Sequence, residues 1–181
     1  QLKPFYFNGS LMIKNKRVEK IIDNFLLYLI SYNENYLGNL NGLFEIKFDD
    51  LNNKLIKMGE LKLIISEKKI NIKEAKFELD KIGYVNSTIS FEEDEGKKKF
   101  ITTNQLTIEN YIEFAKIFQI GSNKVKNIKQ IHFDLEKEYD QTDFIIKNVK
   151  INNDENNQKS SEIYLVKNIQ NLRSHIRKVI D

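Results

Sequence analysis

The sequence has no cysteine and no tryptophan, only one proline and only seven glycines. Without cysteine, disulfides and thiolate chemistry are excluded, which suits either a cytosolic or a periplasmic protein and decides neither. No apolar run reaches the roughly 20 residues that a membrane-spanning helix needs. Arginine occurs only at Arg17, Arg173 and Arg177, whereas proteins that recognise nucleic acids usually rely on arginine forks for phosphate and guanine.

An excess of charge of one sign is also lacking. The 29 basic residues are nearly matched by 26 acidic residues, which leaves a formal net charge of +3. Lysines precede an aromatic residue in Lys97–Phe100, a pattern known from single-strand nucleic-acid binding. Such binding depends on a surplus of positive charge against phosphate. We therefore expect no nucleic-acid partner.

Signatures of catalysis and of metal binding are missing too. Neither a glycine-rich phosphate loop nor a Gly-x-Ser-x-Gly turn occurs, and no serine stands beside an evident base. His132 and His175 are the only histidines, and neither has neighbours at metal-ligand spacing. The acidic turn Glu92–Glu95 lacks the ordered ligands of a calcium loop, and three lysines follow it closely. We expect no enzyme, no cofactor and no metal site, with both histidines on solvated sides of their elements.

What the chain does have is an alternation of apolar and polar residues from Gly59 to Thr103, the period of strands with one buried and one solvated face. The alternation changes parity near Lys73–Glu74, which predicts a bulge or bend there. A second change of parity lies near Lys147–Asn148, within the strand expected over residues 143–152. The residues expected to face inward along the successive strands are Leu61, Leu63, Ile65, Phe77, Leu79, Ile89 and Phe91.

Three segments have helical rather than alternating spacing of their apolar residues. The clearest is residues 17–33, expected to face the core, with contact to a membrane surface or a partner as the alternative. The second is residues 108–118, with Thr107 as its cap and Gly121 at its end. The third is residues 167–180. The predicted fold is therefore α+β, a curved, mostly antiparallel β-sheet meander with two or three covering helices.

The order of these parts resembles the AsmA-like proteins of Gram-negative envelopes. The resemblance rests on the strand Ala75–Leu79, the strand restarted after a glycine at Gly83–Phe91, the strand Phe100–Leu106 and the helix Tyr111–Phe118. It implies a periplasmic protein, anchored in the inner membrane, whose curved sheet carries an apolar groove. It also implies links to outer-membrane assembly and to phospholipid movement, without catalytic residues.

These observations define the expected role and its alternative. Because the chain begins with Gln1 rather than Met, we interpret residues 1–181 as a single fragment of a longer protein, anchored in the periplasm through a segment outside this sequence; the alternative location is cytoplasmic. The expected function is to bind or move lipid acyl chains along the apolar sheet face. The alternative is a structural or protein-interaction module with a closed core, whose partners are other envelope proteins or adjoining repeats of the same chain.

Overall fold

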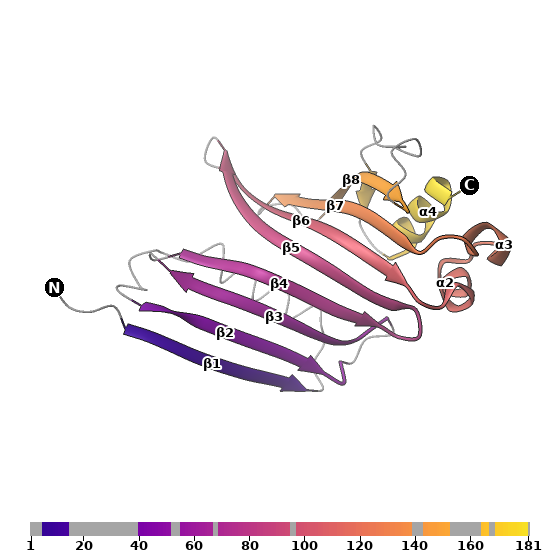
Figure 1. Cartoon of the computed structure of the whole chain (residues 1–181). Helices are drawn as coiled ribbons and strands as arrows, with labels where there is room; N and C mark the ends of the chain where they lie inside the picture. Colours follow the sequence, from indigo (N-terminus) through magenta and orange to yellow (C-terminus); the bar gives the residue numbers. More distant parts are fainter. Residues whose placement is uncertain are drawn as a thin grey trace. The chain divides into compact units, whose positions relative to one another are not determined.

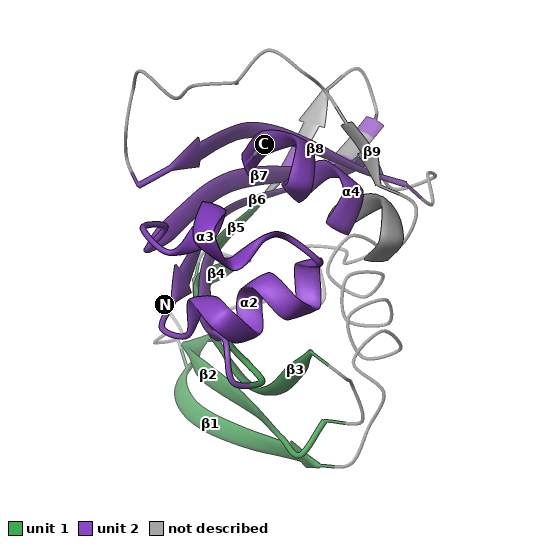
Figure 2. Cartoon of the chain, turned by 90° about the vertical axis from the view of Figure 1, so that its right-hand side faces the viewer, with its two compact units in different colours: residues 1–80, 88–90 green, residues 81–87, 91–181 purple. Residues whose placement is uncertain are grey.

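The computed structural model describes residues 5–14, 40–51, 55–66, 69–94, 97–138, 143–152, 164–166 and 169–180. The helix expected over residues 17–33 lies outside these residues. By its contacts the chain divides into two compact units, residues 1–80 with 88–90 and residues 81–87 with 91–181 (Figure 2). The α+β class is confirmed, because the strands are mostly antiparallel and the helices of the described ranges are few and short (Figure 1).

Unit 1 contains β1 (Phe5–Lys14), β2 (Leu40–Asp49), β3 (Ile56–Ser66) and β4 (Lys69–Leu79), side by side in chain order. β2, β3 and β4 pair antiparallel, whereas β1 and β2 pair in parallel. Parallel neighbours need a connection of roughly a dozen residues or more, and residues 15–39 provide that length. Because β1 stands first in the order of strands, it is the outer strand of unit 1.

The bulge predicted near Lys73–Glu74 is confirmed. Lys62 of β3 lies opposite Glu74, but its neighbour Leu63 lies opposite Ile72, so Lys73 is the extra residue. The extra residue restores the alternation, because it places Ile72 and Ala75 on the same side of the sheet. Both side chains are buried.

Unit 2 contains most of β5 (Gly83–Asp94), then β6 (Lys97–Ile108), β7 (Gln130–Glu138), β8 (Phe144–Ile151) and β9 (Tyr164–Val166). β6 to β9 lie in chain order and pair antiparallel. Among the described residues of this unit, three helices accompany them: α2 (Tyr111–Phe118), α3 (Ser122–Val125) and α4 (Ile169–Ile180). Figure 2 shows α2 and α3 following β6 and α4 lying near β7 and β8. No helix in the described ranges is long and apolar enough to cross a membrane.

The last residue expected for the second helix, Phe118, is confirmed, whereas its expected first residue, its cap and the residue that ends it are wrong. Thr107 is still part of β6, opposite Gln130, and the side chain of Asn110 instead caps α2 by accepting hydrogen bonds from two backbone amides. At the other end Gln119 adopts the left-handed conformation, with φ of 55°, two residues before Gly121. The strand pairing of Thr107 thus overrides its capping propensity.

Candidate binding surface and pocket

One face of unit 1 is apolar on all four strands, and we call it the apolar face. β1 contributes its odd-numbered residues from Phe5 to Ile13, and β2 its even-numbered residues from Leu40 to Phe48. β3 contributes its odd-numbered residues from Gly59 to Ile65. β4 contributes Ile70, Ile72 and, after the bulge, its odd-numbered residues from Ala75 to Leu79. Every one of these positions holds an apolar residue or glycine.

Phenylalanine rings lie over glycines on this face. A Cβ atom placed on Gly59 would come within 2.6 Å of the Phe77 ring, and one on Gly9 within 2.7 Å of the Phe44 ring. Phe48 lies opposite Gly59 on its other side, and its ring stacks on that of Phe77 with centroids 6.5 Å apart. Glycine inside a strand marks such a close approach, and only its missing side chain lets the rings lie flat on the sheet.

The structure places five of the seven expected site residues on the apolar face. Leu61, Leu63 and Leu79 are buried, with 5%, 5% and 8% of their surface exposed. Ile65 and Phe77 are half-buried, as is Ile89 in β5. The side chain of Phe91 lies outside the described part of the chain. The centre of the apolar face is therefore closed to solvent rather than lying open.

Exposed apolar side chains are concentrated instead on β1, which sequence reasoning did not single out, although Leu43, Met58 and Ile112 are also exposed. Phe5, Tyr6, Leu11 and Met12 are 65%, 67%, 46% and 56% exposed. Phe5 and Leu11 belong to the apolar face, whereas Tyr6 and Met12 point to the opposite side. The alternation of β1 is weak for this reason: apolar residues occur on both of its sides.

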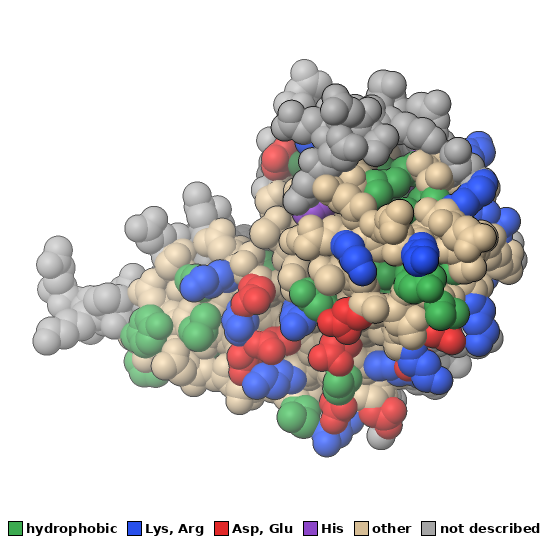
Figure 3. All heavy atoms as spheres, turned by 45° about the vertical axis from the view of Figure 1, so that its right-hand side comes forward, with side chains coloured by type: hydrophobic (Ala, Val, Ile, Leu, Met, Phe, Trp, Pro, Cys, Tyr) green, Lys and Arg blue, Asp and Glu red, His purple; other side chains and the backbone are tan. Residues whose placement is uncertain are grey.

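The opposite side of unit 1, which we call the charged face, holds ion pairs between neighbouring strands. The ammonium group of Lys62 lies 3.2 Å from Glu60 and 2.9 Å from Glu74. The hydrogen bond that Lys62 donates to Glu74, followed by the one with Glu60, raises the pKa of Lys62, and Lys62 in turn lowers the pKa of Glu74. Figure 3 shows acidic and basic side chains intermixed rather than segregated. Such exposed pairs contribute little to stability, because solvent screens them.

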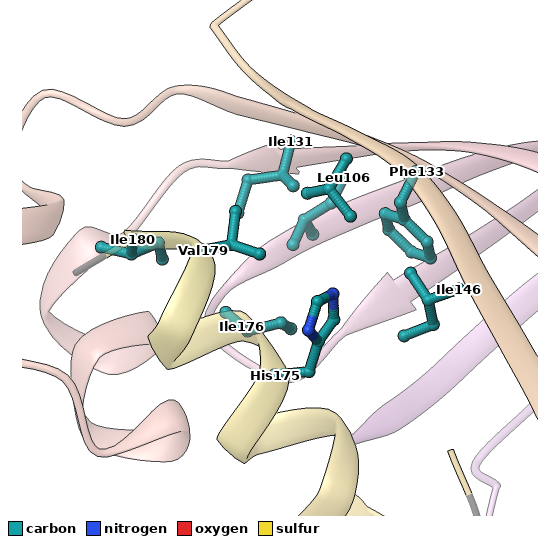
Figure 4. A pocket seen from close by; sticks show the side chains of 9 residues that line it. Leu106, Ile131, Phe133, Ile146, His175, Ile176, Val179 and Ile180 are labelled. Carbon is teal, nitrogen blue, oxygen red and sulfur yellow. The ribbon is translucent and has the colours of Figure 1, made fainter. Parts of the chain in front are cut away.

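Unit 2 contains a small apolar cavity between α4 and the sheet (Figure 4). Its volume is about 30 Å³, which is room for a water molecule or a methyl group. Its wall consists of Leu106, Ile131, Phe133, Ile146, Val149, His175, Ile176, Val179 and Ile180. A cavity of this size cannot hold an acyl chain.

His175 does not lie on the solvated side of its helix as expected. Its ring is 4% exposed and points from α4 toward the sheet, between Ile176 and Ile146 (Figure 4). Arg177, expected on the same wetter side, is half-buried and donates a hydrogen bond from Nε to the carbonyl oxygen of Phe118, 2.9 Å away. The reason is the way in which α4 docks. The composition of this side of the helix predicted that it faces solvent, but in the structure it faces the sheet and α2.

The second change of parity, near Lys147–Asn148, also coincides with a bulge. Lys147 lies opposite Asp134 and Lys150 opposite His132, so β8 has one residue more than β7 in this interval. Asn148 carries the irregularity with φ of 53°. In consequence Ile146 and Val149 both line the cavity although their numbers differ in parity.

Beside the cavity lies a buried polar cluster centred on Asn104, which is 4% exposed. Its side-chain oxygen accepts a hydrogen bond of 2.7 Å from Ser87. Its amide nitrogen donates to the hydroxyl of Thr102 and to the carbonyl oxygen of Phe133. These bonds use both amide hydrogens, so the cluster is internally satisfied and joins β6 to β7.

The other histidine, His132, was expected to be solvated, and this is wrong in part. Its side chain is half-buried between strands, and Nε2 is shielded from solvent without a hydrogen-bond partner among the described residues. Asp134 and Glu136 follow at alternate positions of β7, but Asn148 donates to Asp134, and Lys99 and Lys147 pair with Glu136. Within the described ranges no three acidic or histidine side chains gather as metal ligands would.

Comparison with known proteins adds no relative. No family model, no curated protein and no solved structure matches this chain.

Proposed function

We propose that the protein is a non-catalytic structural or protein-interaction module with a closed core. The observation that carries this proposal is the burial of Leu61, Leu63 and Leu79 at the centre of the apolar face, where a lipid groove would have to be open. Among the described residues, the outer strand β1 holds four of the seven exposed large apolar side chains. Exposed apolar surface concentrated at one place on a protein is typical of contact with a partner.

A second candidate function is the binding of lipid acyl chains in the manner implied by the AsmA-like resemblance. It is favoured by the uninterrupted apolar composition of four neighbouring strands on one face of unit 1. An acyl chain gains roughly 0.8 kcal/mol per buried CH₂, so such a face suffices without head-group contacts. The periplasmic location and the anchoring segment belong to this second proposal.

One pair of variants separates the two functions. Leu63→Glu places a carboxylate at the centre of the apolar face, and Met58→Glu places one on the charged face of the same strand, where the native side chain is 41% exposed. With a closed core, Leu63→Glu unfolds the protein because an unpaired buried charge costs several kcal/mol. Met58→Glu should unfold at the same urea concentration as the wild type, within about 0.5 kcal/mol. Circular dichroism during urea denaturation measures both.

The lipid content of the purified protein completes the test. Mass spectrometry of organic extracts should find no stoichiometric lipid in the wild type if the core is closed by protein. A folded Leu63→Glu variant that has lost a lipid present in the wild type would establish the second function instead. A folded variant without any lipid in either protein would also contradict the closed core, because the site would then tolerate a charge.

A further inference from the structure

The outer strand β1 has the features of a strand that pairs with another strand. Its register with β2 is continuous from Phe5 to Lys14, without a bulge. Within the described ranges, no strand pairs with its other edge. Proteins usually protect such an edge with proline, a bulge, or charged side chains. β1 has a single charge, on Lys14 at its last position, and this ammonium lies 3.5 Å from Asp49 of β2.

The side chains of β1 are exposed on both of its sides, as Tyr6 and Leu11 illustrate. Leaving apolar residues exposed to water on both sides of an unpaired edge costs free energy. A strand added to that edge covers both sides at once. The partner must therefore supply a strand of about nine residues with apolar side chains on both faces.

β1 itself meets this requirement. We propose that β1 pairs antiparallel with β1 of a second copy of the chain, about a two-fold axis that passes through Gly9. The axis places aromatic residues opposite aliphatic ones and polar residues opposite polar ones. The resulting pairs are Phe5 with Ile13, Phe7 with Leu11, Tyr6 with Met12 and Asn8 with Ser10.

This register is selected by the two faces of unit 1. Pairing about Gly9 brings odd-numbered residues opposite odd-numbered ones, so the apolar faces of the two copies continue into each other. A shift by one residue would join the apolar face of one copy to the charged face of the other. A shift by two in one direction places Tyr6 opposite Lys14, and in the other it leaves Met12 and Ile13 beyond the described start of the partner strand. Pairing about Gly9 is also isologous, as closed dimers require.

In this dimer the second copy is the partner of the interaction module proposed above. The dimer therefore rests on that proposed function. The two can fail separately. The Leu63→Glu experiment measures folding and lipid content within one chain, whereas the dimer is tested by mass. A closed core in a chain that stays monomeric would leave the proposed function standing and overturn the dimer.

Sedimentation equilibrium of the full chain tests the dimer, with two variants that depend on the register. At about 100 µM the wild type should have twice the chain mass of 21.4 kDa. Tyr6→Lys alone and Met12→Glu alone should each raise the dissociation constant about tenfold or more, because each is altered twice per dimer. The double variant should recover the dimer, since each introduced ammonium then faces an introduced carboxylate of the other copy.

Met58→Lys is the matched control, because Met58 is exposed on β3, away from the outer edge, and should leave the dimer unchanged. Circular dichroism confirms that all variants are folded, as expected for residues whose side chains are exposed. A monomeric wild type at this concentration overturns the proposal. So does a dimer that both single variants leave intact, and so does a double variant that stays monomeric.

Discussion

Among the described acidic residues of unit 2, Glu136 is the one whose pKa is shifted most clearly by its surroundings. It accepts a hydrogen bond from Lys147, and the ammonium of Lys99 lies 3.7 Å from its other oxygen. The bond from Lys147 holds the pKa of Glu136 below its ordinary value of 4.5, although partial burial acts in the opposite direction. Since the pKa is lower in the folded than in the unfolded chain, the ionised carboxylate stabilises the fold above pH 4.5, and this contribution disappears as the pH falls through the folded-state pKa.

We expect Glu136→Gln to lower the free energy of unfolding at pH 7 by about 0.5–1 kcal/mol, the range of a well-placed ion pair near the surface. The difference from the wild type should vanish at a pH below the folded-state pKa of Glu136, where both chains lack the charge. Urea denaturation at the two pH values measures this. The exposed Glu109→Gln serves as control and should change little at either pH. An equal loss of the free energy of unfolding at both pH values would show that the shape of the Glu136 side chain, rather than its charge, is responsible.

Asparagine side chains perform local tasks that differ from residue to residue. Asn110 caps α2. Asn152, with φ of 53°, accepts hydrogen bonds from the amides of Lys129 and Gln130 and donates to the carbonyl oxygen of Asn127, so it holds the start of β7 to the end of β8. Asn104 bridges two strands from a buried position. The short amide side chain, which has both donors and an acceptor, makes all three roles available.

At the scale of the element, the bulges in β4 and β8 decide which side chains reach the core. In β4 the extra residue Lys73 lets Ile72 and Ala75 share a face, and in β8 the irregularity at Asn148 does the same for Ile146 and Val149. Each bulge thus corrects a pattern whose alternation would otherwise bury a charged or polar side chain. A bulge also increases the local twist of the strand.

Deletion of Lys73 should therefore be tolerated. The remaining residues alternate regularly from Ile70 to Leu79, so we expect a change in the free energy of unfolding of about 1 kcal/mol or less. Deletion of Lys76 is the matched control. It forces either Phe77 and Leu79 or Glu74 onto the wrong face, which should cost about 3 kcal/mol or more. Urea denaturation of both deletion variants compares them; similar losses would contradict the role of Lys73 as an extra residue.

At the scale of the whole molecule, the strands of each unit lie in the order in which the chain supplies them. Neighbouring strands in the antiparallel parts are therefore close in sequence, which keeps the entropy cost of closing each connection low. β1 and β2 are the exception, since they pair in parallel and parallel neighbours need a longer connection than a hairpin.

The distribution of charge leads to a prediction at this scale. Acidic and basic side chains alternate on the surface shown in Figure 3, and the net charge is only +3. A fluorescent single-stranded oligonucleotide should therefore show no change in anisotropy with up to about 10 µM protein at about 150 mM salt, because few counterions would be released. Binding in this range that weakens steeply with salt would contradict the prediction and indicate a basic surface.

The sequence by itself determined the features that depend on the period of the side chains. The α+β class and both bulges could be predicted because a strand shows each face at every second residue, and a change of parity is visible without knowledge of any neighbour. The apolar residues of the central strands could be named for the same reason. The sequence could not predict whether Phe77 lines an open groove or Leu63 lies in a closed core, because exposure depends on what packs against the face.

The tertiary structure decided the features that depend on a second element. Thr107 and Asn110 are both good capping residues, and the pairing of Thr107 with Gln130 made Asn110 the cap. His175 appeared solvated from its helix alone, but α4 docks with this ring toward the sheet. Likewise, nothing local to β1 reveals that it pairs in parallel and forms the outer strand of unit 1. Contacts between residues distant in sequence selected among local preferences of similar energy, and these contacts determine both the core and the edge.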